Sequence, residues 1–130
     1  MRRRTILLLF LSAFCAGPLC AQGQTEEFFN PYLAEKNVEI GTYYLKKKNY
    51  DAAIERFLDA IRYKSNHALA HRRLAEAFEG KGELADAVQY YTKYLEILPS
   101  AGDADKVRKR IEKLKKEIER RAARRRGRSG

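Results

Sequence analysis

The chain has 130 residues, enough for one small domain, and its formal net charge is +10. This charge is uneven: residues 22–105 sum to −3 and the residues from Lys106 onward sum to +10, so the basicity belongs to a C-terminal segment rather than to the domain. Both cysteines, Cys15 and Cys20, precede residue 22. A mature chain that starts there has none, which excludes disulfides, thiol chemistry and Cys-ligated metal sites.

The first 21 residues are typical of a secretory signal peptide. Arg2–Arg4 precede the apolar run Ile6–Leu11, and small residues follow up to Ala21. The apolar core has about ten residues, whereas a membrane-spanning helix needs roughly 20, which disfavours a retained anchor. We therefore predict cleavage after Ala21 and export to the periplasm or cell envelope. One alternative stays open, in which Cys20 is the lipid acceptor of a bacterial lipoprotein, although Leu19 differs from the small residue that usually precedes such a Cys.

Residues 22–33 form an N-terminal segment that we expect to be partly ordered. Its apolar and aromatic side chains are Phe28, Phe29, Tyr32 and Leu33. They either fold back onto the helices that follow or meet a partner. We expect the fold-back, because a short helical array has an exposed edge to cover before it is stable.

A period of 34 residues begins after this segment. A shift by that period places Ile40–Gly41 on Leu74–Ala75, Tyr44 on Phe78, Ala53 on Ala87, Ile54 on Val88, Phe57 on Tyr91 and Ile61 on Leu95. Within each unit, apolar residues recur at steps of three and four on both sides of a polar break, Lys46–Asn49 or Gly80–Gly82. Each unit is therefore predicted to be two antiparallel helices joined by a short turn, over residues 34–67 and 68–101.

This pattern resembles the tetratricopeptide repeat. The family's large apolar residue with Gly or Ala, its aromatic residues, its second-helix Ala and its closing Pro are matched by Ile40–Gly41, Leu74–Ala75, Tyr44, Phe78, Ala53, Ala87, Phe57, Tyr91 and Pro99. Asn37 and His71 depart from it, standing where a bulky apolar residue is usual, and Ser65 replaces the first closing Pro. The resemblance implies an all-α fold, a short α-solenoid of two helix-turn-helix repeats.

A further helix is predicted over residues 102–121. Its apolar residues Val107, Ile111, Leu114 and Ile118 recur at steps of four, three and four and form one stripe. We expect the stripe to cover the second repeat as a capping helix, and Tyr94, where the family usually has Ala, to pack against it. Residues 122–130 carry no such stripe, so we expect a basic, disordered tail there.

The chain offers little for catalysis. His67 and His71 lie four residues apart on one predicted helix face, but Ala68 stands where a zinc-protease signature needs Glu. Two His without a third ligand seldom form a zinc site. We therefore assign His67 to the turn between the repeats and His71 to the half-buried bulky position. With no phosphate-binding loop or Ser/His/Asp set in view, we expect no enzymatic activity, metal or cofactor.

The resemblance also implies a protein-binding surface. Tetratricopeptide repeats bind an extended segment or a helix of a partner on the concave surface formed by the first helix of each unit. By position, this surface comprises Glu35, Val38, Thr42, Leu45, Lys46, Leu69, Arg72, Glu76 and Glu79. Thr42 and Glu76 stand where members that hold a C-terminal carboxylate have Asn, so the mixed lining favours an amphipathic segment. The alternative is that these residues are only the solvated face of two helices.

We therefore expect a non-enzymatic scaffold or adaptor of the bacterial cell envelope, similar to small envelope repeat proteins such as the lipoproteins that help assemble outer-membrane proteins. This expectation is an analogy of fold and location.

Two alternatives remain. One is binding to an anionic membrane surface or polysaccharide through Arg120, Arg121, Arg124, Arg125, Arg126 and Arg128. Nucleic acid is disfavoured as that polyanion, because the tail has no aromatic residue for stacking and export removes the chain from the chromosome. The other alternative is a homo-oligomer that completes the short array.

Overall fold

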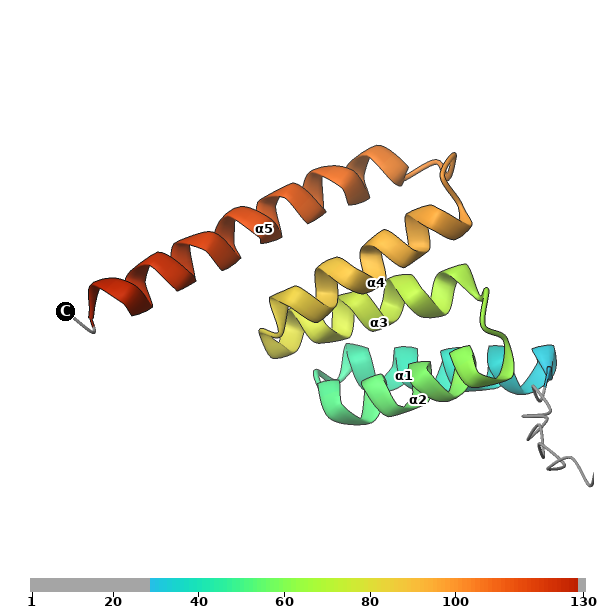
Figure 1. The fold of residues 1–130 in the computed structure, drawn as a ribbon. Coiled ribbons are helices and arrows are strands. Elements are labelled where there is room, and N and C mark those ends of the chain that lie inside the picture. The colour runs from blue at the N-terminus through green and yellow to red at the C-terminus, as the bar shows by residue number, and fades with distance from the viewer. Residues whose placement is uncertain (1–28, 129–130) are drawn as a thin grey trace, which may run out of the picture.

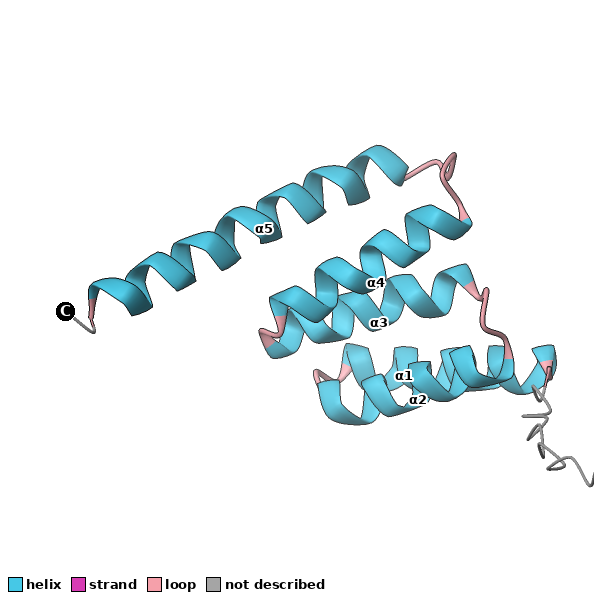
Figure 2. Cartoon of the chain, viewed as in Figure 1, coloured by secondary structure: helices cyan, strands magenta, loops and turns pink. Residues whose placement is uncertain are grey.

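A computed structural model describes residues 29–128 (Figure 1). They form five α-helices and no strand: α1 (Pro31–Lys46), α2 (Tyr50–Tyr63), α3 (Ala68–Lys81), α4 (Leu84–Ile97) and α5 (Ala104–Gly127). Figure 2 shows two helical hairpins, α1–α2 and α3–α4, followed by α5. The predicted all-α repeat fold with a terminal helix is confirmed. None of the helices within residues 29–128 is both long and apolar enough to cross a membrane.

The ends of the helices are set by capping residues. Side chains accept hydrogen bonds from the free backbone N–H groups at three N-termini, and a glycine ends α3. Asn30 and Asn49 each accept a hydrogen bond from the backbone N–H three residues further on, which caps α1 and α2. His67 caps α3 in the same way through its ring nitrogen. Gly82 ends α3 with φ +88°, a left-handed conformation that glycine adopts without a Cβ clash.

The first hydrophobic core joins the two repeats. Phe57 and Leu74 are its largest fully buried side chains. Its other members are Val38, Ala53, Ile54, Ala60, Ala70 and Ala77. Gly41 lies directly against the Phe57 ring, where a Cβ would come within 2.6 Å of a ring carbon. The small residue of the repeat pattern is therefore required by the close approach of α1 and α2.

The second core joins the second repeat to α5. Its buried members are Ala75, Leu84, Ala87, Tyr91, Tyr94, Val107, Ile111 and Leu114, and Ile118 packs at its edge. The predicted capping stripe is thus confirmed. The expected packing of Tyr94 is confirmed as well: its ring lies in this core, and its hydroxyl donates to the Asp103 carboxylate at 2.5 Å.

The expected fold-back of the N-terminal aromatic residues is wrong for two of them. Phe29 and Tyr32 are 67% and 76% exposed. The physical reason is that α1 begins at Pro31, three residues before the predicted boundary, so the helical period that buries Ala34 and Val38 turns Tyr32 toward solvent. Leu33 is partly buried. Phe28 and the predicted signal peptide lie outside the described residues.

The expected disorder of residues 122–130 is wrong for residues 122–127, because α5 continues to Gly127. Ala and Arg, which fill this part of the chain, are among the best helix formers, so a helix already started by packing extends without an apolar stripe. An ion pair of 3.1 Å between Glu117 and Arg121, four residues apart, supports the turn just before this part. Residues 129–130 lie outside the described part.

The substitution Gly41→Ala is expected to lower the melting temperature. The added methyl group meets the buried Phe57 ring, and overpacking of this kind costs about 1–3 kcal/mol, more than the roughly 1 kcal/mol that Ala contributes to a helix. Thermal unfolding followed by circular dichroism measures the effect. Gly127→Ala is the matched control, because nothing lies within 4 Å of the added atom there. An unchanged or raised melting temperature for Gly41→Ala would contradict the close packing of α1 and α2.

Candidate functional site

A groove of about 620 Å³ lies between α1, α3 and α5. Its lining mixes charged, aromatic and aliphatic side chains. They are Leu45, Lys46, Lys48, Tyr50, Arg72, Glu76, Glu79, Gly80, Tyr91, Asp103, Lys106, Val107 and Arg110. The two first helices of the repeats form two of its walls, as the repeat pattern predicts, and α5 forms the third.

The third wall was missed by the sequence analysis. The period that places Leu45 on Glu79 also places Arg72 on Lys106 and Glu76 on Arg110. The first half of α5 therefore stands where the first helix of a third repeat would stand, and it lines the concave surface accordingly. The signal was present in the sequence, because the 34-residue period continues from Arg72 and Glu76 to Lys106 and Arg110.

The predicted surface residues divide between two hollows. The main groove brings together Leu45, Lys46, Arg72, Glu76 and Glu79. Val38, Thr42 and Leu69 line a second hollow of about 450 Å³ beside them, with Glu35, Glu39, Tyr43, Lys46 and Arg73. Val38 is only 4% exposed and belongs to the first core, so it forms the floor of that hollow and offers little surface to a partner.

Two arginines bind the three carboxylates of the main groove. Arg72 lies 2.8 Å from Asp103 and 3.3 Å from Glu76, which ties α3 to the start of α5. Arg110 of α5 pairs with Glu79 of α3, with its Nε donating at 2.9 Å. Each carboxylate is partly shielded from solvent by its neighbours, so these pairs are screened less than fully exposed ones.

Tyrosine hydroxyls add to the same network. Tyr94 donates to Asp103, and this hydrogen bond holds the pKa of the Asp103 carboxyl below its ordinary value. Tyr91 donates to Glu79 at 3.1 Å, and burial raises the pKa of Tyr91 to about 12. Asp103 is therefore ionised and Tyr91 is neutral at physiological pH. The network joins α3, α4 and α5 around the groove.

Three lysines in the groove have no such partner. Lys46, Lys48 and Lys106 are exposed, and within residues 29–128 none of them lies at ion-pair distance from a carboxylate. They stand beside the partly exposed aliphatic side chain of Leu45. The groove thus presents uncompensated positive charge next to apolar surface, which suits a ligand that carries both negative charge and apolar side chains.

The two histidines fasten the junction between the repeats. His67 accepts from the Ala70 backbone N–H through Nδ1 and lies 3.1 Å from a Glu35 oxygen through Nε2. His71 donates from Nε2 to the Ser65 carbonyl at 2.8 Å and stacks on Tyr90. In the part of the chain that the structure describes, no group of three or more His, Cys, Asp or Glu is arranged to hold a metal ion.

Acid is expected to destabilise the fold through His71. Its Nδ1 is buried without a hydrogen bond, and burial lowers its pKa below 6.5, so the unfolded chain binds the proton more readily than the folded one. The stability that neutral His71 provides is therefore complete above about pH 6.5 and is lost as the pH falls below this value.

Melting temperatures measured between about pH 7.5 and about pH 5 check this expectation. His71→Phe keeps a ring against Tyr90 and removes the titrating group, so its melting temperature should fall less over this range than that of the wild type. Parallel declines for the two proteins would show that another group causes the acid sensitivity.

Comparison with known proteins agrees with this architecture. A family model described as tetratricopeptide repeat matches residues 38–102, a range that includes most of α1 and the whole of α2, α3 and α4. The "Hsp70-Hsp90 organizing protein 3" of Arabidopsis thaliana is 27% identical over 77 residues, which cover 59% of this chain. The chain spans only 14% of the length of that relative.

Proposed function

Because this chain belongs to the tetratricopeptide repeat family, we propose that it is a non-enzymatic scaffold or adaptor that binds a segment of another protein. The observation that carries the proposal is the groove of about 620 Å³ between α1, α3 and α5. Its relative in Arabidopsis thaliana is named for two proteins that it organises, which supports a protein as the ligand.

The chemistry of the groove specifies the kind of segment. Its carboxylates are bound by arginines, whereas Lys46, Lys48 and Lys106 are not paired within residues 29–128. An acidic segment with aliphatic side chains would pair with these lysines and cover Leu45, whose side chain is partly exposed at the groove. A basic segment would have to displace arginines from partly shielded carboxylates. In an open groove, the new ion pairs would not compensate for those that are lost.

Reversing two groove charges is expected to weaken partner binding about tenfold or more, which corresponds to at least about 1.4 kcal/mol. The variant Lys46→Glu/Lys106→Glu changes one unpaired lysine on each of two walls, α1 and α5. Neither side chain takes part in an ion pair, so the melting temperature should stay near that of the wild type. A partner is first trapped by a photo-crosslinker placed at Leu45, and its affinity is then measured by fluorescence anisotropy.

The matched control is Lys64→Glu/Lys93→Glu, which makes the same change in net charge away from the groove. The control should bind the partner as the wild type does. Equal weakening of both variants, or crosslinks obtained only from a probe at the exposed Leu58 of α2, would refute the assignment of the groove.

We also propose that the mature protein works in the bacterial cell envelope after export. The support is the order of Arg2–Arg4, the apolar run Ile6–Leu11 and the small residues before Gln22. An acyl chain on Cys20 would make it a lipoprotein, and a role beside outer-membrane assembly proteins is the finer form of the proposal.

Mass spectrometry of the protein isolated from its native cells tests export. We expect Gln22 as the first residue, within one or two positions, and enrichment in the periplasmic or envelope fraction. If the first residue is instead a lipid-modified Cys20, the mature protein is lipid-anchored and not soluble. A chain that retains Met1 in the cytoplasmic fraction would contradict export altogether.

A further inference from the structure

The last part of α5 is longer than its capping role requires. Ile118 is the last residue of α5 that packs against the second core, yet the helix runs on to Gly127. Figure 1 shows this end of α5 projecting beyond the turn between α3 and α4. Arg121 donates to the Gly82 carbonyl at 3.3 Å at the start of the projection, and the residues beyond it are exposed.

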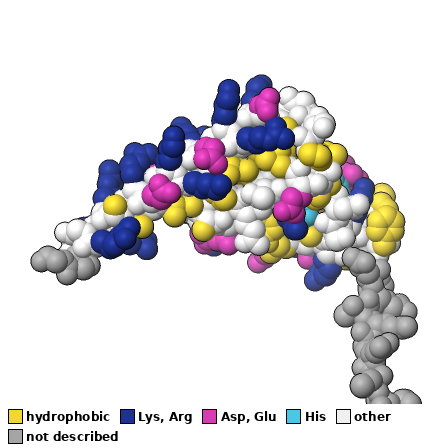
Figure 3. All heavy atoms as spheres, turned by 45° about the horizontal axis from the view of Figure 1, so that its top comes forward, with side chains coloured by type: hydrophobic (Ala, Val, Ile, Leu, Met, Phe, Trp, Pro, Cys, Tyr) yellow, Lys and Arg dark blue, Asp and Glu magenta, His cyan; other side chains and the backbone are white. Residues whose placement is uncertain are grey.

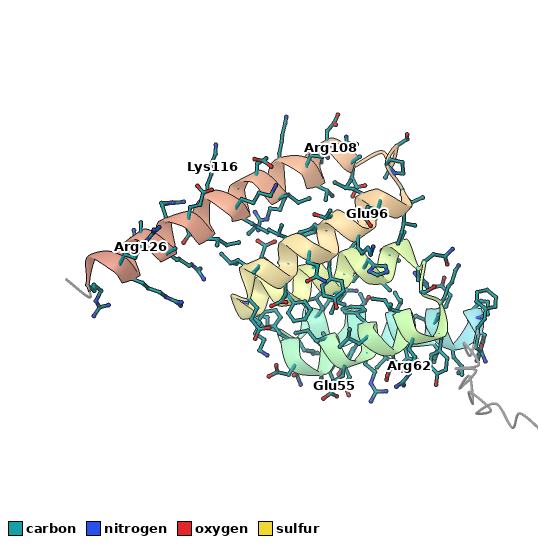
Figure 4. All side chains as sticks on the ribbon, in the orientation of Figure 1. Glu55, Arg62, Glu96, Arg108, Lys116 and Arg126 are labelled. Carbon is teal, nitrogen blue, oxygen red and sulfur yellow. The ribbon has the colours of Figure 1, made fainter. Side chains whose placement is uncertain are left out.

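One side of α5 carries a line of basic residues, which we call the cationic row. It consists of Lys109, Lys113, Lys116, Arg120, Arg124 and Arg128. These residues follow one another at steps of three and four, which on an α-helix places them within about a third of its circumference. The row lies on the side of α5 away from its apolar stripe. Figure 3 shows Lys and Arg side chains along the outer side of α5, and in Figure 4 Lys116 points away from α4.

The row is not neutralised from within the protein. Lys109, Lys113, Lys116, Arg124 and Arg128 have no ion pair inside residues 29–128. Among the described residues the only acid within the same arc is Glu117, and it pairs with Arg120 and Arg121. Like charges four residues apart on a helix repel one another and weaken it. The row therefore destabilises the projecting helix unless an external anion compensates it.

We propose that the cationic row binds the anionic headgroups of a membrane surface, with α5 lying along that surface. The first four members of the row, Lys109, Lys113, Lys116 and Arg120, lie within about 60° of arc and can meet a flat surface together. The row has no apolar side chain that would insert between acyl chains, so contact is with headgroups. This inference goes beyond the proposed partner groove, because the row and the groove lining share no residue.

Other partners fit the row less well. A second copy of this chain would bring two cationic rows together, and they repel. Nucleic acid meets the charge requirement, but the row offers no aromatic side chain for base stacking. The predicted signal peptide also places the chain at a membrane, at least during export.

Vesicle co-sedimentation of the full chain tests the proposal. The surfaces are mixed phosphatidylglycerol and phosphatidylcholine vesicles and, as the neutral reference, pure phosphatidylcholine vesicles. The wild type should bind the anionic vesicles more tightly, and added salt should weaken that binding. Lys109→Gln/Lys113→Gln/Lys116→Gln should bind them roughly 100-fold more weakly, since each basic residue near an anionic surface contributes about a fivefold factor.

The matched control is Lys36→Gln/Lys64→Gln/Lys93→Gln, which removes the same charge from other helices. It should keep nearly all of the vesicle binding, and both variants should melt close to the wild type. Equal loss in the two variants would show that net charge alone is responsible and would overturn the row as a site. Binding to a DNA duplex without any preference for anionic vesicles would assign the row to nucleic acid and overturn the proposal.

Discussion

Asp103 is the point at which α3, α4 and α5 meet. It accepts a hydrogen bond from Tyr94 of α4 and pairs with Arg72 of α3, and it stands at the N-cap of α5. These contacts set where α5 starts and in which direction it leaves the second repeat. The groove has α5 as its third wall and the cationic row lies on the outer side of the same helix, so both surfaces depend on this junction.

The packing of α5 against the second repeat is stabilised mainly by apolar burial and not by this polar junction. Val107, Ile111 and Leu114 are buried, and burial of each such side chain is worth about 1.5–3 kcal/mol, whereas a partly exposed ion pair is worth about 0–1 kcal/mol. The apolar stripe therefore holds α5 on the domain, and the polar contacts of Asp103 determine the orientation of the helix. This division lets the outer flank of α5 vary in charge without loss of the fold.

Charge is distributed so that the fold and its surfaces use different residues. Arg72 and Arg110 neutralise the carboxylates of the groove, whereas the groove lysines and every member of the cationic row except Arg120 have no ion pair within residues 29–128. Both proposed interactions therefore involve anionic partners, although residues 22–105 sum to −3. Because these charges are exposed, both interactions should weaken as ionic strength rises.

Local periodicity in the sequence determined the helices, the two repeats, the close approach at Gly41 and the capping stripe, because such patterns depend on residues within one or two turns of each other. Five of the nine residues predicted to line the concave surface lie around one groove for the same reason. Only the tertiary structure decided that Arg110 pairs with Glu79, 31 residues away, that Val38 lies beneath the surface, and that Tyr32 faces solvent. Contacts between residues so far apart in the sequence depend on how one helix packs against another. The spacing of residues within a single helix does not determine that packing.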